Sequence, residues 1–338
     1  MRKLFLLSIT AISLLLCGCS QTEKDTAKAD ENTNTQSTIT VSHAFGETTL
    51  SKKPERIAAI GWSNQDTPLA LGVVPICVPA ANYGKMTEKN LYPWTEEAFT
   101  KLGENNPVVY SDADGINYEV LSSNQPDLIV AASSGITQEE YDLLSQIAPV
   151  VAYPTKPWQT TWREQTQLIS KAMGMEEEGN AKIKEVEQLI QDKLETYPNL
   201  KGTKTAFCWI SPDDFSTFSI YLPKDSRVAY LSDLGLVLPD SVQKLSETSD
   251  EFYLNISREN TDQLNDVEMM IVYGNESLLS TLQQDKLMSK IPAIKNGAVA
   301  FVDSDTYLAG ACSPSILSIP YEIDDYLSLL SNARDKVK

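Results

Sequence analysis

The chain has 338 residues, enough for two domains of ordinary size, and its 42% hydrophobic and 22% charged residues exclude a chain that is disordered throughout. There are 28 Lys and Arg residues against 46 Asp and Glu, which gives a formal net charge of −18. This charge repels phosphate backbones and excludes a general nucleic-acid binder.

Residues 1–19 have the parts of an export signal. Arg2 and Lys3 give a positive start, and the apolar run after them is too short to cross the roughly 30 Å hydrocarbon core of a membrane. The run ends in Leu16-Cys17-Gly18-Cys19, which resembles the bacterial lipobox. The resemblance implies that Cys19 becomes an acylated N-terminal residue whose lipid anchors the chain. An ordinary secretory signal with an incidental Cys19 is the alternative.

Residues 20–38 contain no large apolar side chain, so they predict a disordered tether on which a membrane-held domain can swing. Loss of the signal removes two cations and lowers the formal charge from −18 to −20. Three unmodified cysteines then remain, Cys77, Cys208 and Cys312. An odd number of thiols indicates that disulfides are not the framework of the fold.

After the tether, short apolar runs alternate with segments of helical length, a pattern typical of parallel α/β sheets. A strand pair is expected around Phe45-Gly46, within residues 39–50. Further strands are expected at residues 57–61, 73–78, 128–132, 150–153, 205–210, 269–273 and 298–302. Helices are expected at residues 138–147, 228–234 and 278–288.

Between the two halves, apolar residues recur every three or four positions from Ile183 to Tyr197, which predicts one long helix that Pro198 ends. A helix resists bending, so we expect two Rossmann-like α/β lobes that tilt modestly about a preformed cleft. The expected segments are a signal peptide (1–19), a tether (20–38), an N-terminal lobe (39–174), the linker helix (175–198) and a C-terminal lobe (199–338).

Ligands of open α/β sheets bind beyond the carboxyl ends of the strands, and aromatic residues are frequent there in this sequence. Their rings bury apolar ligand surface while hydroxyl and indole N–H groups fix orientation. Each ring alone is compatible with core packing, and we expect about half of them to contact a ligand. The candidates are Trp62, Tyr83, Tyr153, Trp158, Trp209 and Tyr307, with Trp94 and Tyr221 on loops within reach. Arg227, before a helix, is the candidate contact for an anion or a chelate oxygen.

Short motifs occur in a characteristic order, and the order is more specific than any one of them. They are Lys53-Pro54-Glu55-Arg56-Ile57, Ile116-Asn117-Tyr118-Glu119, Gln125-Pro126-Asp127-Leu128-Ile129, Ile147-Ala148-Pro149-Val150-Val151 and Ser257-Arg258-Glu259. Over roughly residues 40–330 the chain resembles the siderophore-binding lipoproteins of ABC importers, a class with a rigid helical backbone that includes cobalamin and haem carriers. The resemblance implies a monomer on the extracytoplasmic face of the cell membrane.

In that family, two glutamates on opposite lobes dock into arginine pockets of the permease, which works with a cytoplasmic ATPase. The resemblance implies this role for Glu119 and Glu259. Asn117 and Ser257 are good N-caps, so a favourable place in the first helical turn explains either glutamate equally well. The arrangement occurs once in each half, which favours docking.

The resemblance also implies a ferric siderophore as ligand, with no cofactor and no direct metal ligation by the protein. Few clustered basic residues and a charge of −20 favour near-neutral hydroxamate chelates over anionic catecholates or citrate complexes. Haem and cobalamin are the alternatives within the class. A tyrosine or the single histidine, His43, would then be the axial ligand of a haem.

Two other classes of protein compete with a binding protein. One is an extracellular hydrolase, and the other is an adhesin, which needs only a membrane anchor, a tether and a stable domain. The sequence has neither a Gly-x-Ser-x-Gly elbow nor a Gly-x-x-x-x-Gly-Lys-Ser/Thr loop. A Ser-His-Asp triad would have to use His43. We therefore expect a binding protein that is not an enzyme.

Overall fold

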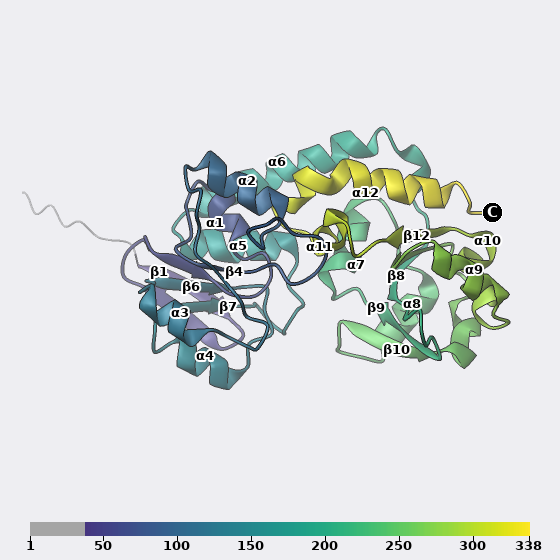
Figure 1. The fold of residues 1–338 in the computed structure, drawn as a ribbon, viewed down its shortest axis with the longest axis horizontal. Coiled ribbons are helices and arrows are strands. Elements are labelled where there is room, and N and C mark those ends of the chain that lie inside the picture. Colours follow the sequence, from purple (N-terminus) through teal and green to yellow (C-terminus); the bar gives the residue numbers. More distant parts are fainter. Residues whose placement is uncertain (1–37) are drawn as a thin grey trace, which may run out of the picture. The chain divides into compact units, whose positions relative to one another are not determined.

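The structure, a computed structural model, describes residues 38–338. The expected signal peptide, Cys19 and all of the expected tether except Thr38 lie outside the described residues. Within residues 38–338, two α/β lobes are joined by the long helix α6 (Glu176–Leu194) (Figure 1). None of the helices in this part of the chain combines the length and apolar character needed to span a membrane.

The N-terminal lobe contains a parallel sheet covered by helices, with an antiparallel hairpin at its start. The hairpin pairs Ile39 with Leu50 and turns at residues 43–46, as expected. Sheet order is β3-β6-β7, and a bridge between Ala58 and Cys77 brings the pair β4-β5 alongside β3. The strands are β1 (Ile39–His43), β2 (Gly46–Leu50), β3 (Ile57–Ala59), β4 (Val78–Pro79), β5 (Val109–Tyr110), β6 (Leu128–Ala131) and β7 (Val150–Ala152). The helices are α1 (Asp66–Ala70), α2 (Pro93–Lys101), α3 (Tyr118–Ser123), α4 (Gln138–Leu144) and α5 (Trp162–Ala172).

The C-terminal lobe has one five-stranded sheet in the order β10-β9-β8-β11-β12. Its strands are β8 (Thr205–Trp209), β9 (Thr217–Tyr221), β10 (Tyr253–Ser257), β11 (Met269–Tyr273) and β12 (Val299–Val302). Its α-helices are α7 (Ser226–Asp233), α8 (Asp240–Ser246), α9 (Ser277–Gln284), α10 (Pro292–Asn296), α11 (Tyr307–Ala311) and α12 (Ser318–Arg334). Short 3₁₀ helices are η1 (Pro198–Leu200), η2 (Arg258–Leu264) and η3 (Met288–Lys290).

Two features of these sheets differ from the sequence expectation. β9 and β10 are antiparallel to their neighbours, whereas a repeat of the parallel scheme was expected. The loop 210–216 is shorter than the dozen or so residues that a parallel crossover needs, so β9 returns as a hairpin. Of the strand expected at 73–78, only Val78 belongs to β4, while Cys77 forms an isolated bridge with Ala58.

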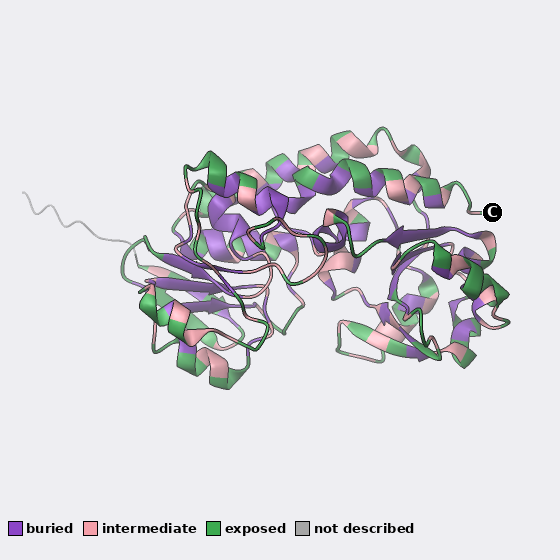
Figure 2. Ribbon diagram, viewed as in Figure 1, coloured by how far each residue is buried: buried purple, intermediate pink, exposed green. Residues whose placement is uncertain are grey.

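The central strands of both sheets are buried (Figure 2), whereas β9 and β10 have exposed residues. Side chains alternate across β8, where Phe207 enters one core while Ala206 and Cys208 enter the other. Layered packing of this kind fixes the strand ends, and therefore the loops that follow them, on one rigid support.

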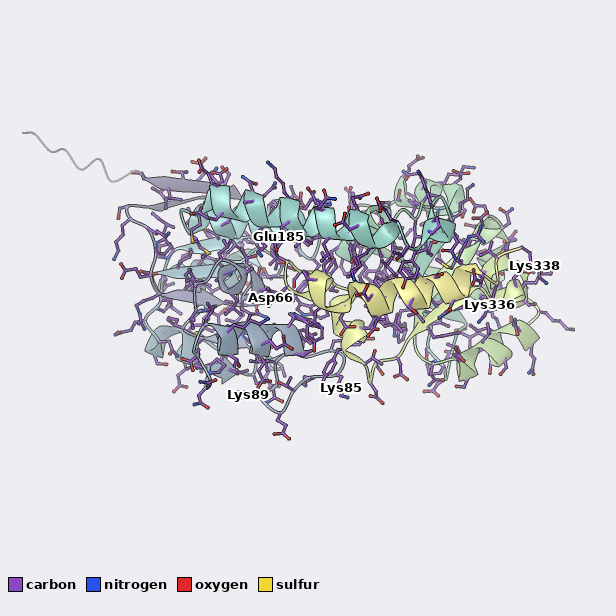
Figure 3. All side chains as sticks on the ribbon, turned by 90° about the horizontal axis from the view of Figure 1, so that it is seen from above. Asp66, Lys85, Lys89, Glu185, Lys336 and Lys338 are labelled. Carbon is purple, nitrogen blue, oxygen red and sulfur yellow. The ribbon has the colours of Figure 1, made fainter. Side chains whose placement is uncertain are left out.

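Helix α6 buries Ile183, Val186 and Ile190 on one stripe, as the spacing predicts. It ends at Leu194, a few residues before Pro198, which starts η1 instead. Helix α12 lies beside α6 in both views (Figures 1 and 3). Lys193 Nζ and Asp324 Oδ2 join the two helices at 2.6 Å, so the bridging helix is braced along its C-terminal part.

A second, buried connection joins the lobes beside α6. Asp66, at the start of α1, accepts hydrogen bonds from Trp94 Nε1 at 3.1 Å and from Thr95 Oγ1 at 2.8 Å. It also accepts one from Ser315 Oγ, in the segment between α11 and α12. Leu317, in the same segment, packs against cores of both lobes. The lobes are therefore held by side-chain contacts as well as by the helix.

Candidate binding cleft

Two adjoining hollows of about 770 and 600 Å³ lie between the lobes, and the carboxyl ends of β3, β6, β8 and β11 contribute to their lining. They share Trp62, Arg227 and Phe252, and we call them together the cleft. The N-terminal lobe contributes Trp62, Tyr83, Ser133 and Trp158. The C-terminal lobe contributes Trp209, Ser219, Tyr221, Asp225, Ser226, Arg227, Phe252, Tyr253, Tyr273 and Ser313.

Trp62 is held by the turn that follows β3. Gly61 has φ of +76°, and a Cβ there would lie 2.5 Å from Ser133 O, so the turn requires glycine. Trp62 N donates to Ser133 O at 2.9 Å, and Gln165 Nε2 donates to Trp62 O at 2.9 Å. The backbone of Trp62 is therefore fixed from two sides, and its indole is presented to the cleft.

Trp158 forms the neighbouring part of the wall. Its φ is +60°, which is uncommon for a bulky residue, and its N donates to Ser134 O at 3.0 Å. The indole packs against Gly135, where a Cβ would lie 2.3 Å from Trp158 Nε1. Its ring meets that of Trp62 edge to face, with centroids 6.5 Å apart. The two indoles form one continuous apolar surface on the N-terminal lobe.

The opposite wall is built from the last residues of three strands of the C-terminal lobe. Trp209, Tyr221 and Tyr273 end β8, β9 and β11. Trp209 is 45% exposed, whereas Tyr273 is 6% exposed at the base of the cleft. Tyr83 reaches across from the other lobe and contacts the Tyr273 ring edge to face at 5.2 Å. Burial raises the pKa of Tyr83 to about 12, so this hydroxyl stays protonated as a hydrogen-bond donor.

Arg227 is the cationic group of the cleft and forms an ion pair with Asp225. Asp225 caps α7, and its Oδ1 accepts from Arg227 N at 2.9 Å. Its two carboxylate oxygens also accept from Arg227 Nε and Nη2, at 2.8 and 2.7 Å. Burial alone would lower the pKa of Arg227, but the charge and hydrogen bonds of Asp225 raise it above its usual value. The guanidinium carbon lies 3.8 Å from the centroid of the Tyr221 ring.

At the mouth of the cleft, the loops that carry Trp158 and Phe252 touch. Lys156 Nζ lies 3.3 Å from Asp250 Oδ2, and Gln159 Nε2 donates to Asp250 O at 2.9 Å. Lys224 from the C-terminal lobe also pairs with Asp250, at 2.8 Å. The contacts of Lys156 and Gln159 with Asp250 link the two lobes, whereas the Lys224 pair lies within the C-terminal lobe.

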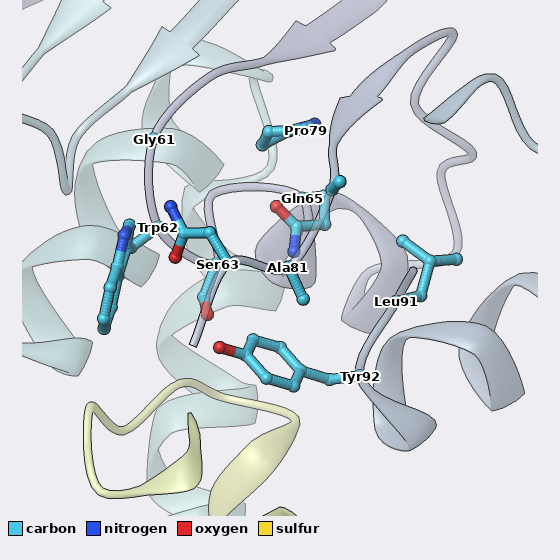
Figure 4. Close-up of a pocket in the computed structure, with 10 residues that line it drawn as sticks. Gly61, Trp62, Ser63, Gln65, Pro79, Ala81, Leu91 and Tyr92 are labelled. Atoms are coloured by element: carbon cyan, nitrogen blue, oxygen red, sulfur yellow. The ribbon is translucent and has the colours of Figure 1, made fainter. Parts of the chain in front are cut away.

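A smaller hollow lies behind Trp62, on the N-terminal lobe (Figure 4). Gln65 and Tyr92 line it, and the side chain of Gln65 is 5% exposed. Gln65 Oε1 has no hydrogen-bond partner among residues 38–338. Tyr92 Oη donates to Tyr83 O at 2.8 Å, which fixes the loop that carries Tyr83.

Six of the nine residues expected to bind ligand therefore line the cleft. They are Trp62, Tyr83, Trp158, Trp209, Tyr221 and Arg227. Tyr221 does so from the end of β9, and not from a loop as expected.

The structure does not place Trp94, Tyr153 or Tyr307 in the cleft. Trp94 belongs to α2, is 3% exposed, and donates its indole N–H to the buried Asp66. Tyr153 is 5% exposed because the N-terminal hairpin covers it, and its hydroxyl donates to Ile136 O at 3.0 Å. Tyr307 packs beside Tyr92 and Trp94 at the contact between the lobes.

Sequence reasoning missed Tyr273, Phe252 and Tyr253. Tyr273 is the last residue of the apolar run 269–273. The rule that residues at strand ends line the cleft identifies it if the last residue of a run is included with the residues that follow the run. Phe252 and Tyr253 stand at the start of β10. Tyr253 pairs with Tyr221 across β9 and β10, so it lies on the same face of the sheet as Tyr221 and reaches the cleft there. The sequence expectation contained no strand at β10 and gives no signal for these residues.

The alternatives from the sequence involve His43 and the cysteines. His43 is 7% exposed in the hairpin, and Nε2 lies 2.9 Å from Thr48 Oγ1 while Nδ1 accepts from Phe45 N at 3.2 Å. This histidine is thus engaged on the N-terminal hairpin. Cys77, Cys208 and Cys312 are buried free thiols. In residues 38–338 there is no group of three or more His, Cys, Asp or Glu side chains placed to hold a metal ion.

A family model described as "Periplasmic binding protein" matches residues 57–306, more than half of the chain. The chain belongs to the periplasmic binding protein family. The prediction of two α/β lobes joined by a long helix, in an extracytoplasmic class of binding proteins, is confirmed by this match and by the solved neighbours.

Individual periplasmic binding proteins similar to this chain are named for iron complexes. The chain is 27% identical over 288 residues to the Fe(3+) dicitrate-binding periplasmic protein FecB of Escherichia coli, covering 80% of this chain and 86% of FecB. It is 25% identical over 313 residues to the Fe(3+)-citrate-binding protein YfmC of Bacillus subtilis, covering 89% and 90%. The solved structure of Streptococcus pneumoniae PiaA in complex with ferrichrome aligns with a TM-score of 0.86 at 48% identity, covering 89% of this chain and 100% of PiaA.

Proposed function

We propose that this protein is an extracytoplasmic substrate-binding lipoprotein that captures a ferric siderophore and delivers it to an ABC importer permease. The observation that carries the proposal is the cleft, in which indole and phenol rings from both lobes surround one guanidinium group. A ferric chelate presents apolar arms, which pack against aromatic rings. It also presents a few oxygen atoms, which accept hydrogen bonds from single donors.

The cleft supports a ferric hydroxamate as the type of siderophore. Three hydroxamates neutralise Fe³⁺, so such a chelate needs hydrogen-bond donors and apolar walls, and Arg227 with the tyrosines supplies the donors. PiaA, at 48% identity, was solved with ferrichrome. The citrate-binding relatives are more distant, at 27% and 25% identity. The iron is held by the siderophore, and the protein itself needs no cofactor.

Delivery is proposed to use Glu119 and Glu259. Both carboxylates are exposed, and neither forms an ion pair with a residue of the described chain. Glu119 lies in the first turn of α3, where Asn117 Oδ1 accepts from Val120 N at 3.1 Å. Glu259 lies in the first turn of η2, where Ser257 Oγ accepts from Glu259 N at 3.3 Å. Each carboxylate is thus presented on a capped turn of a different lobe, available to a permease arginine.

The membrane anchor is proposed to be a lipid on Cys19, with residues 20–38 as the tether. This arrangement keeps the binding protein near its permease while the tether allows reorientation. We propose that the protein acts as a monomer and has no enzymatic activity of its own.

Tryptophan fluorescence tests the function. Trp62, Trp158 and Trp209 line the cleft, whereas Trp94 and Trp162 are buried elsewhere and provide an internal reference. Micromolar ferric hydroxamate should quench the emission of the purified protein. The triple change of the three cleft tryptophans to Phe should remove most of that quenching.

The same titration should include a ferric catecholate, ferric citrate and haem. Quenching by haem alone would favour the haem-carrier alternative. Absence of saturable quenching by every ferric chelate would refute the proposed function.

A further inference from the structure

We propose that Asp225 is a specificity-determining residue, which cancels the charge of Arg227 so that the cleft accepts uncharged ferric hydroxamates and rejects polyanionic ferric chelates. This inference rests on the proposed function. It assigns to Asp225 a role in choosing among iron complexes, in addition to its role as the cap of α7.

The geometry of the pair supports charge cancellation. Asp225 Oδ1 accepts from Nε and Oδ2 accepts from Nη2 of Arg227, the two-pronged arrangement that best matches a carboxylate to a guanidinium. The Asp225 side chain is 2% exposed and that of Arg227 is 14% exposed. Little water separates the two charges from a bound ligand, so both act on it with little screening.

The other residues that line the cleft carry no formal charge at neutral pH. Among the described residues of its walls, only Asp225 and Arg227 are ionised, and the rest are aromatic rings and serines. At the mouth, Lys156 and Lys224 share the single carboxylate of Asp250, so this exposed cluster carries one net positive charge outside the walls. A ligand in the cleft therefore meets donors and rings within walls of zero net charge.

A cleft without net charge should bind uncharged iron complexes more tightly than anionic ones. Fe³⁺ with three hydroxamates has no net charge and loses little hydration energy on entry. A ferric dicitrate complex carries several negative charges, which must be desolvated without a free cation to compensate them. A change that removes the Asp225 charge leaves one unbalanced positive charge in the wall, which should attract the anionic complex.

The test compares the wild-type protein with Asp225→Asn by isothermal titration, using ferrichrome and ferric dicitrate as the two probes. Asn is also a good N-cap, so α7 keeps its start. The measured quantity is the ratio of the dissociation constant for ferric dicitrate to that for ferrichrome. We expect this ratio to fall at least about tenfold in Asp225→Asn, the effect of one partly screened charge a few ångströms away.

Two further variants keep the test decisive. Asp240→Asn removes an equal charge from the same lobe, at an exposed site outside the cleft where Asp240 pairs with Lys204, and should leave the ratio unchanged. The double variant Asp225→Asn with Arg227→Gln restores zero charge without the pair, and its ratio should return toward that of the wild type.

The possible failures are distinguishable. A wild-type protein that does not bind ferrichrome overturns both the proposed function and this inference. A wild-type protein that binds ferrichrome, with an unchanged ratio in Asp225→Asn, overturns the inference alone. So does a double variant that keeps the gain for ferric dicitrate, because the gain would then not arise from charge.

Discussion

At the scale of single residues, the cleft depends on side chains whose positions are set by what lies behind them. Trp158 is 39% exposed, yet its indole is fixed because the absent side chain of Gly135 makes room for it. The backbone of Trp158 is held in a left-handed conformation by its hydrogen bond to Ser134 O. A wall of the cleft is thus specified by a glycine that does not itself line the cleft.

A substitution at Gly135 tests this support. In Gly135→Ala the new Cβ would lie 2.3 Å from Trp158 Nε1 and must displace the ring. We expect affinity for a ferric hydroxamate to fall about fivefold, because one aromatic contact of roughly 1 kcal/mol is lost.

A double-mutant cycle with Trp158→Ala provides the control, measured by the same titration. If Gly135 acts through the indole, Gly135→Ala has no further effect once the indole is gone. An equal loss of affinity in the Trp158→Ala background would contradict this explanation.

At the scale of elements, α1, α2 and the segment before α12 meet at the carboxylate of Asp66. Burial raises the pKa of Asp66 from 3.8 to about 6, although hydrogen bonds from Ser315, Thr95 and Trp94 act in the opposite direction. The folded protein therefore favours the protonated acid more than the unfolded chain does. The stability that this preference contributes is complete below about pH 4 and is lost as the pH rises through about 6.

Asp66→Asn should remove that pH dependence, since an amide of the same shape never ionises. Relative to the wild type, the free energy of unfolding of Asp66→Asn should rise by about 2 to 3 kcal/mol between pH 4 and pH 7. Urea unfolding of both proteins at the two pH values measures the difference, in which contributions of other groups such as Glu322 cancel. A difference that stays constant with pH would show that folding does not change the pKa of Asp66.

At the scale of the whole molecule, the surfaces proposed for ligand binding and for delivery are separate. Glu119 and Glu259 stand on different lobes, and neither lines the cleft. Two separated carboxylates orient the protein on a permease better than one patch, and a buried arginine left without its partner costs about 2 kcal/mol.

The double change Glu119→Ala with Glu259→Ala should therefore keep affinity for the ferric hydroxamate and abolish uptake of radioactive iron by cells. Glu139→Ala with Glu276→Ala is the matched control, because these glutamates are also exposed at helix starts of the two lobes. Normal uptake in the first variant, or equal loss in the control, would remove the docking role.

Much of the local structure could be predicted from the sequence, because hydrophobic spacing is a property of neighbouring residues. The stripe of Ile183, Val186 and Ile190 predicted α6, and the apolar runs predicted the central strands. The expectation that residues at strand ends line the cleft also located Trp62 and Trp209, which line it in the structure.

Which strand-end rings face the cleft could not be predicted, because it depends on how distant segments pack in the folded chain. Tyr153 and Tyr273 occupy similar places in sequence, but β7 is an edge strand covered by the hairpin, while β11 is a central strand that opens onto the cleft. Trp94 depends on Asp66, and Asp66 on Ser315, which is 249 positions away. Contacts between residues so far apart in the sequence depend on how the lobes pack. A pattern of adjacent residues therefore does not predict them.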